Sequence, residues 1–149
     1  MSYTVGEVLA AAQVTAVTGF SSSNVTRGEW GILNSGKSDH YAILKRGETN
    51  FVWEGRSNTE NYRTIIEVWQ RVKDDQASYD LLNGYVDTIK ARLDSYRKLA
   101  DTTGTLRDAN LVGTGVITEQ WRNNADGPAW LKIELYLDWT EESYVNFAE

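Results

Sequence analysis

The sequence predicts an α+β fold, in which two helices pack on one face of a mainly antiparallel sheet. Two observations predict it. The expected elements run in the order helix, strands, helix, strands, and the last strand alternates apolar and polar residues along its length. The length of 149 residues matches one globular domain and is enough for an ordinary hydrophobic core. We therefore expect a single domain over residues 1–149.

The first helix is expected at about residues 5–17. Thr4 and Glu7 have the spacing of a capping box, in which both side chains satisfy backbone groups at a helix start. Gly19 is expected to end the helix. Apolar residues at helical spacing predict the buried face, namely Val5, Val8, Leu9 and Ala12.

Three strands are expected before the second helix, at residues 41–45, 51–54 and 62–72, with Gly47 ending the first. The longest one has apolar or β-branched residues on both faces. Ile65 and Trp69 lie on one face, and the other carries Thr64, Ile66, Val68 and Val72. Neither face is therefore expected to be fully open to water.

The second helix is expected at about residues 76–96. Asp74 and Asp75 precede it and are suited to cap it, because negative charge is favoured at a helix N-terminus. Basic residues gather near its C-terminal end, as the helix dipole favours: Lys90, Arg92, Arg97 and Lys98. A single apolar stripe follows three- and four-residue steps: Tyr79, Leu82, Val86, Ile89, Leu93 and Tyr96.

Two strands are expected to close the chain. The first, at 111–122, is interrupted by Gly113 and Gly115, which indicates a bulge or a sheet edge. The second, at 131–139, alternates cleanly, and its inward residues are Leu131, Ile133, Leu135, Leu137 and Trp139.

Composition excludes several classes of chemistry. The chain has no Cys, so disulfides, zinc–thiolate sites and thiol catalysis are ruled out. Its one His, His40, rules out multi-histidine metal sites, and we expect no cofactor. The formal net charge of −6 disfavours tight binding of duplex DNA, because Lys and Arg supply most phosphate affinity.

No targeting segment is expected. The N-terminal residues lack a basic region, and Glu7 interrupts the only apolar stretch that could serve as a signal peptide. No apolar run approaches the roughly 18 residues of a membrane span. We therefore expect folding in a cytoplasm and no membrane partner.

Residues 31–38, GILNSGKS, satisfy the phosphate-binding P-loop pattern through Gly31, Gly36, Lys37 and Ser38. A P-loop needs a buried strand before it and a helix after it, because the helix N-terminus helps to hold the phosphates. Residues 26–30 do not look like a buried strand, and residues 41–44 look like a strand. The context favours a glycine turn that presents Lys37, and a small nucleotide-binding enzyme stays as a remote alternative.

Two other groups of polar residues could suggest a catalytic triad or a metal site, but the sequence disfavours both. Ser38, Asp39 and His40 are consecutive, whereas a catalytic triad needs side chains that converge in space. The carboxylate pairs Asp74–Asp75 and Glu141–Glu142 have the ligand type of a hard cation, but such pairs are more often solvated surface charges. We predict no catalytic and no metal-binding residues.

The aromatic content is the more informative feature. Of six Trp residues, Trp30, Trp53 and Trp130 lie in or beside expected turns, where a core role is less automatic. The terminal segment adds Tyr144 and Phe147. Because Trp and Tyr are enriched at interface hot spots, these five residues are candidates for an assembly interface, and a core role stays open for each.

Several segments resemble one known family, the tail-terminator (tail-completion, head–tail joining) proteins of long-tailed bacteriophages. The similar segments cover most of the chain after about residue 25. They are residues 30–44 with the core NSGKSDHY, 67–74 with EVWQR, 93–99 with LDSYRKL, 127–130 with GPAW and 139–142 with WTEE. None of them is a catalytic signature.

The resemblance implies a virion structural protein and not an enzyme. Members of this family form a ring, usually a hexamer, on the head-proximal end of the tail tube. The implied partners are other copies of the chain, the tail tube protein and the head connector, with DNA only passing through the lumen. The implied location is the tail or neck of the virion, after assembly in the host cytoplasm. Another neck or head-completion protein, or a minor tail protein, is the alternative.

Overall fold

The computed structural model describes residues 2–55, 57–95, 106–121 and 129–144, and within these ranges the side chains of 2–5, 106–108, 121 and 141–144 are not described. The described residues form two α-helices and a mostly antiparallel six-stranded sheet, which confirms the α+β class. The elements are α1 Ser2–Thr15, β1 Val25–Arg27, a 3₁₀ helix Trp30–Asn34, β2 His40–Glu54, β3 Ser57–Arg71, α2 Asp75–Ser95, β4 Leu106–Thr114, β5 Thr118–Trp121 and β6 Ala129–Tyr144.

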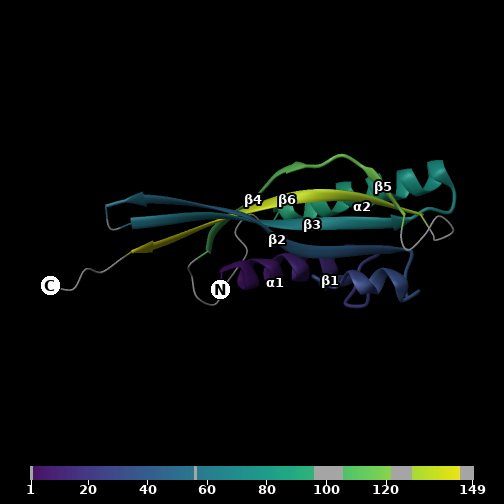
Figure 1. Cartoon of the computed structure of the whole chain (residues 1–149), viewed down its shortest axis with the longest axis horizontal. Helices are drawn as coiled ribbons and strands as arrows, with labels where there is room; N and C mark the ends of the chain where they lie inside the picture. Colours follow the sequence, from purple (N-terminus) through teal and green to yellow (C-terminus); the bar gives the residue numbers. More distant parts are fainter. Residues whose placement is uncertain (1, 56, 96–105, 122–128, 145–149) are drawn as a thin grey trace.

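The sheet is built around three long strands (Figure 1). Its order is β1-β2-β3-β6-β4, and β5 also pairs with β6. Among the strand pairs of the described residues, only β1–β2 is parallel. Since β2, β3 and β6 each have 15 or 16 residues, they are far longer than a typical strand and extend past both helices (Figure 1).

One large hydrophobic cluster joins both helices to the sheet. Ala10 and Val14 from α1 and Leu82 and Ile89 from α2 belong to it. Its sheet members are alternate residues of the long strands: Ala42, Leu44, Tyr62, Ile66, Val68, Ile133, Leu135, Leu137 and Trp139. A smaller cluster is formed by the opposite residues of these strands with the 3₁₀ helix, namely Leu33, Tyr41, Ile43, Trp69 and Trp130.

The first helix differs from the prediction. It begins at Ser2, so Thr4 lies inside it, and Glu7 pairs with Arg27 at 3.0 Å instead of completing a capping box. The predicted apolar face is also rotated. Val8 is 49% exposed, whereas Gly6, Ala10 and Val14 are buried. A Cβ on Gly6 would lie 3.0 Å from Trp139 Cε2, so a glycine allows α1 to approach the sheet closely.

The two short strands predicted at 41–45 and 51–54 are one continuous strand, β2. Gly47 does not end it, and a β-bulge between Arg46 and Thr49 adds one residue to the strand instead. The strand predicted at 111–122 is two strands, β4 and β5. The expected bulge near Gly113 is confirmed by a register shift between Leu111 and Gly113.

The prediction for α2 is confirmed closely. The Asp74 carboxylate accepts a hydrogen bond from the Ala77 backbone N–H at 2.9 Å, which is the geometry of a helix N-cap. Leu82, Val86, Ile89 and Leu93 are buried as expected. Tyr79 is the exception, because it is 46% exposed and Ser78 is buried in its place. The predicted contributions of Tyr96, Arg97 and Lys98 lie outside the described residues.

Candidate assembly surfaces

The long strands form an arm that projects beyond the helices at one end of the molecule (Figure 1). We define the arm as residues 49–54 of β2, 57–61 of β3 and 140–144 of β6, which pair side by side. At its outer strand Phe51, Val52 and Trp53 are 60%, 48% and 58% exposed. Three consecutive exposed apolar side chains are unusual on a free surface, so the arm is a candidate interface.

The β-bulge in β2 decides which way these side chains face. Before the bulge Leu44 pairs with Ile66, and after it Phe51 pairs with Glu60 and Trp53 with Asn58. The extra residue therefore brings Phe51 and Trp53 onto the sheet face that carries Tyr62 and the large hydrophobic cluster. The arm thus continues the sheet face that carries the large hydrophobic cluster, and it reaches beyond both α1 and α2 (Figure 1).

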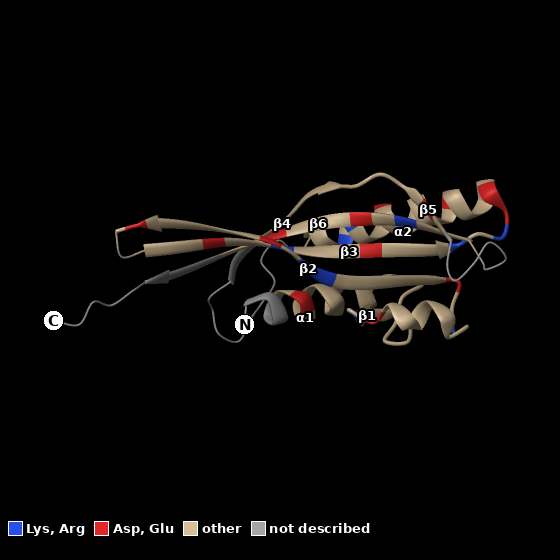
Figure 2. Ribbon diagram, in the orientation of Figure 1, with Lys and Arg blue, Asp and Glu red and all other residues tan. Residues whose placement is uncertain are grey.

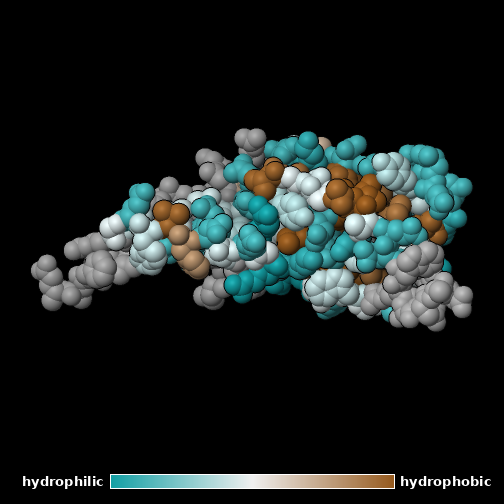
Figure 3. All heavy atoms as spheres, turned by 45° about the horizontal axis from the view of Figure 1, so that its top comes forward, coloured by the Kyte–Doolittle hydropathy of each residue, from teal (hydrophilic) through white to brown (hydrophobic). Residues whose placement is uncertain are grey.

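In the space-filling view, hydrophobic residues show on the arm and in several patches on the body of the molecule (Figure 3). On the body, Val112 of β4 and Val116 after it are 53% and 79% exposed. On α2, Tyr79 and Leu81 are also about half exposed. Val8 of α1 and Trp30 of the 3₁₀ helix are exposed as well, so the exposed apolar side chains are spread over the arm, one sheet edge and the helices.

The structure places the five predicted interface residues in different environments. Trp53 lies exposed on the arm. Trp130 is only 2% exposed and packs against Tyr41 and Trp69, so within the single chain it takes the core role that the sequence left open. Tyr144 ends β6 opposite Ser57, but its side chain is not described, and Phe147 lies outside the described residues.

Trp30 is partly exposed and fixed in place by a buried carboxylate. Its indole N–H donates to Glu67 Oε1 at 2.7 Å, and Trp69 donates to the same oxygen at 3.0 Å. Lys45 Nζ lies 2.7 Å from Glu67 Oε2. Burial alone would raise the pKa of Glu67, but hydrogen bonds from these three groups hold that pKa below its ordinary value. The carboxylate therefore stays charged and orients Trp30.

Ion pairs continue along the same sheet face, where acidic and basic residues lie next to one another (Figure 2). Lys45 also contacts Glu134 at 2.9 Å, and Arg63 makes a two-point contact with Asp138 at 2.7 and 3.2 Å. The pKa of Arg63 is raised by this partner. Because Lys45 and Arg63 are already paired, these two cations have little free positive charge to offer a phosphate backbone.

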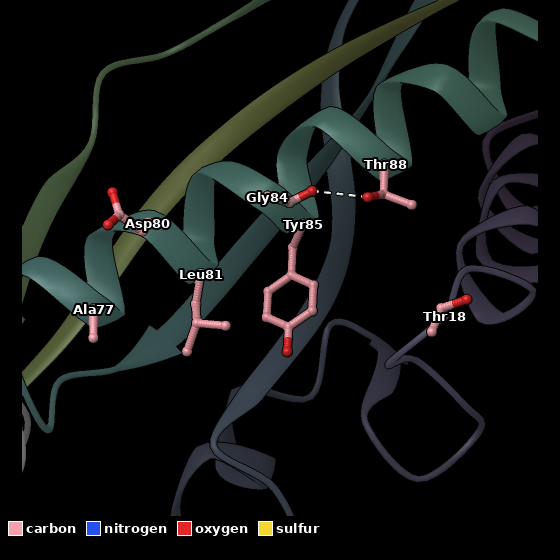
Figure 4. Close-up of a pocket in the computed structure, with 7 residues that line it drawn as sticks. All are labelled: Thr18, Ala77, Asp80, Leu81, Gly84, Tyr85 and Thr88. Carbon is pink, nitrogen blue, oxygen red and sulfur yellow. Dashed lines mark hydrogen bonds between the residues drawn. The ribbon is translucent and has the colours of Figure 1, made fainter.

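The second candidate surface, after the arm, is a groove of about 590 Å³ along α2 (Figure 4). We call it the α2 groove. Leu81 and Tyr85 point into it together with Ala77, and Thr18 from the segment after α1 faces them (Figure 4). The other lining residues are Asp80, Gly84 and Thr88. A Cβ on Gly84 would meet nothing within 4 Å, so the middle of the groove is open.

The consecutive residues Ser38, Asp39 and His40 do not form a triad. Asp39 pairs with Lys73 at 2.6 Å, and the hydrogen bond from Lys73 lowers the pKa of Asp39. His40 stacks on Tyr85 with ring centroids 4.4 Å apart, and its Nε2 bonds to the Gly19 carbonyl. Asp39, His40, Lys73 and Tyr85 border a hollow of about 400 Å³ that adjoins the α2 groove.

Residues 31–38 lack the geometry of a P-loop. They run from the 3₁₀ helix through a turn, where Gly36 has a φ of +70°, and strand β2 follows at His40. A P-loop lysine and serine sit at the start of a helix, and here Lys37 and Ser38 precede a strand. The Ser38 N–H and Ser35 hydroxyl bond instead to the Tyr41 hydroxyl.

Among the residues that the structure describes, no three His, Asp or Glu side chains come together as metal ligands. Asp74 caps α2, and the side chains of Glu141 and Glu142 are not described. Within the same residues, no helix is long and apolar enough to span a membrane.

Comparison of the chain with known protein families and with curated proteins finds no match.

Proposed function

We propose that this protein is a virion structural protein that forms a ring, usually of six copies, on the head-proximal end of a phage tail tube. The ring would end tube polymerisation and join the tail to the head. The similarity of residues 30–44, 67–74, 93–99, 127–130 and 139–142 to tail-terminator proteins suggests this function. We further infer that the chain is one domain, with both helices on the same face of the sheet.

The observation that carries the proposal is the arm with its exposed Phe51 and Trp53. A side chain of this kind is stabilised by burial, and aromatic residues are the commonest anchors of protein interfaces. A ring gives every copy the same contacts and leaves no copy with an unused arm. The exposed apolar surface is therefore better explained by assembly with other chains than by catalysis.

The charge distribution supports a ring through which DNA passes without being bound tightly. The formal net charge is −6, and the basic residues Lys45 and Arg63 are held by carboxylates. A lumen lined by such a chain would let DNA pass without retaining it, because few phosphate contacts could form. Retention of duplex DNA by the isolated ring at physiological salt would contradict this part of the proposal.

Addition of the purified protein to polymerising tail-tube subunits tests the function. A terminator should shorten the tubes at amounts well below one copy per tube subunit, because it acts only at tube ends. A protein that leaves tube lengths unchanged but binds the head connector would instead be another neck or head-completion protein. A protein incorporated along the tube would be a minor tail protein.

The remote alternative, a nucleotide-binding enzyme that uses Gly31, Gly36, Lys37 and Ser38, has its own test. Titration of ATP and GTP into the wild type and the Lys37→Ala variant should give no saturable binding in either. Saturable binding that is lost in the variant would support the enzyme and contradict the structural role.

A further inference from the structure

We propose that the arm of one copy places Phe51 and Trp53 in the α2 groove of the next copy, and that this contact repeats around the ring. The inference rests on the proposed function, because it names the contact that would hold the ring together. It assigns two surfaces of the same chain to each other, the arm as the inserted part and the α2 groove as the receiving part.

The arm is suited to insertion because its three strands are paired along its length. Its outer strand pairs with β3 from residue 49 to residue 54, and β3 pairs with β6 as far as Ser57. Phe51 and Trp53 lie on one face of this support, and both are more than half exposed. An aromatic side chain buries about 150–250 Å² when it is covered, so these two residues offer the largest apolar area on the arm.

The α2 groove is suited to receive them because its floor is apolar and open. Leu81 is 49% exposed, and Ala77 and Gly84 leave space on either side of it. The volume of about 590 Å³ lies within the range of about 300–1,000 Å³ that is typical of pockets that hold small ligands. The small residues Ala77 and Gly84 leave room beside Leu81 for the large side chains of the arm.

The occupant is a second copy because of where the two surfaces lie. Helix α2 starts at the end of the molecule opposite the arm, so a chain cannot place its arm in its own groove (Figure 1). A contact between two different surfaces of identical chains is heterologous, and it continues from copy to copy until a ring closes. This is the symmetry that the proposed function requires.

The small size of the contact also favours a closed ring over an isolated dimer. Three strands about 4.8 Å apart and five residues long, at about 3.3 Å per residue, present a face of roughly 240 Å². Both partners together would bury about 500 Å², below the roughly 1,000 Å² of a stable pair. In a closed ring each copy makes the contact twice, once with its arm and once with its groove. We therefore expect monomers and complete rings, with few dimers between them.

Cross-linking tests the contact directly, because the chain has no Cys of its own. Glu60→Cys places a thiol beside Phe51 on the arm, and Asp80→Cys places one at the groove. A short bifunctional thiol reagent should link a mixture of the two variants into dimers. It should link the double variant into a ladder that ends at the ring number. Val116→Cys, on the exposed segment between β4 and β5, replaces Asp80→Cys in the control and should give no product with Glu60→Cys.

Other products would overturn the proposal. Dimers from Glu60→Cys alone would mean that arms pack on arms, and dimers from Asp80→Cys alone would mean that α2 packs on α2. An oligomeric preparation in which the mixture gives no dimers would exclude the contact while leaving the ring itself intact.

A second test fills the groove without touching the arm. Gly84→Leu adds a side chain where a Cβ has free space, and Gly84→Ala is the matched control. We expect Gly84→Leu to weaken association at least tenfold and Gly84→Ala to change it little, with the same helix content in both. Equal association of the two variants would overturn the proposal. If the wild type fails to shorten tail tubes, the proposed function fails, whatever the cross-links show.

Discussion

Replacement of Glu67 tests how the sheet face with the smaller hydrophobic cluster is held together. Glu67 is 2% exposed and accepts contacts from Lys45, Trp30 and Trp69 at 2.7, 2.7 and 3.0 Å. Glu67→Ala leaves the Trp69 N–H without its acceptor and Lys45 with only Glu134. Removal of one partner from a buried ion pair costs about 3–5 kcal/mol, so we expect a loss of that size in the free energy of unfolding.

Two further variants separate charge from packing. Glu67→Gln keeps an oxygen that can accept from the indoles but loses the charge, and we expect a loss of about 1–3 kcal/mol. Glu134→Gln changes the more exposed partner of Lys45 and should cost less than about 1 kcal/mol. Urea unfolding followed by tryptophan fluorescence at pH 7 measures all three. A Glu67→Ala protein within about 1 kcal/mol of the wild type would refute this reasoning.

The pH dependence of the same variants gives an independent check. The pKa of Glu67 is lowered in the folded protein from an ordinary value of 4.5. A lowered carboxyl pKa contributes stability that is complete above the unfolded pKa and is lost as the pH falls through the folded pKa. The difference between the wild type and Glu67→Gln should therefore be constant at pH 6–8 and should shrink below about pH 4.5. A difference that stays constant down to pH 3 would contradict the assignment.

Three smaller changes concern the helices, and urea unfolding measures each of them. Asp74→Ala removes the N-cap of α2 and should cost about 1 kcal/mol; an unchanged midpoint would mean that the cap contributes nothing. Gly84→Ala should gain up to about 1 kcal/mol, because it raises helix propensity at a position with free space. Gly6→Ala makes the same exchange, but its Cβ would lie 3.0 Å from Trp139, so we expect no gain or a loss. Equal gains from the two glycine variants would show that α1 does not pack tightly on Trp139.

The sequence predicted the elements whose patterns are regular. Helix α2 was predictable because its apolar residues repeat at three- and four-residue steps and Asp74 marks its start. Strand β6 was predictable because apolar and polar residues alternate from Ile133 to Trp139. In both elements the regularly spaced apolar residues belong to the same large hydrophobic cluster, so the local sequence pattern and the tertiary packing agree.

The errors arose where a glycine has a tertiary role. Gly47 suggests the end of a strand when it is considered alone, but β2 continues through it because the bulge accommodates the extra residue. The face of α1 was misplaced because a glycine carries no apolar signal. A Cβ on Gly6 would nevertheless lie 3.0 Å from Trp139 and 3.2 Å from Tyr62, so the missing side chain is what allows the close approach.

The candidate surface was only partly predictable for a similar reason. Trp53 was identified by its residue type, but Phe51 beside it was not, because the projection of the arm depends on strand lengths that the sequence did not give. The burial of Trp130 was not predictable because the alternation in β6 describes only the face with the large hydrophobic cluster. The opposite face has its own small core with Tyr41 and Trp69.

Images of tail tubes that carry the protein test its assignment as a tail terminator. We predict a single ring of density at one end of each tube, the end that receives the head, with no density elsewhere along the tube. Protein along the tube wall, at both ends, or absent from tubes that still stop at a defined length would contradict the assignment as a tail terminator.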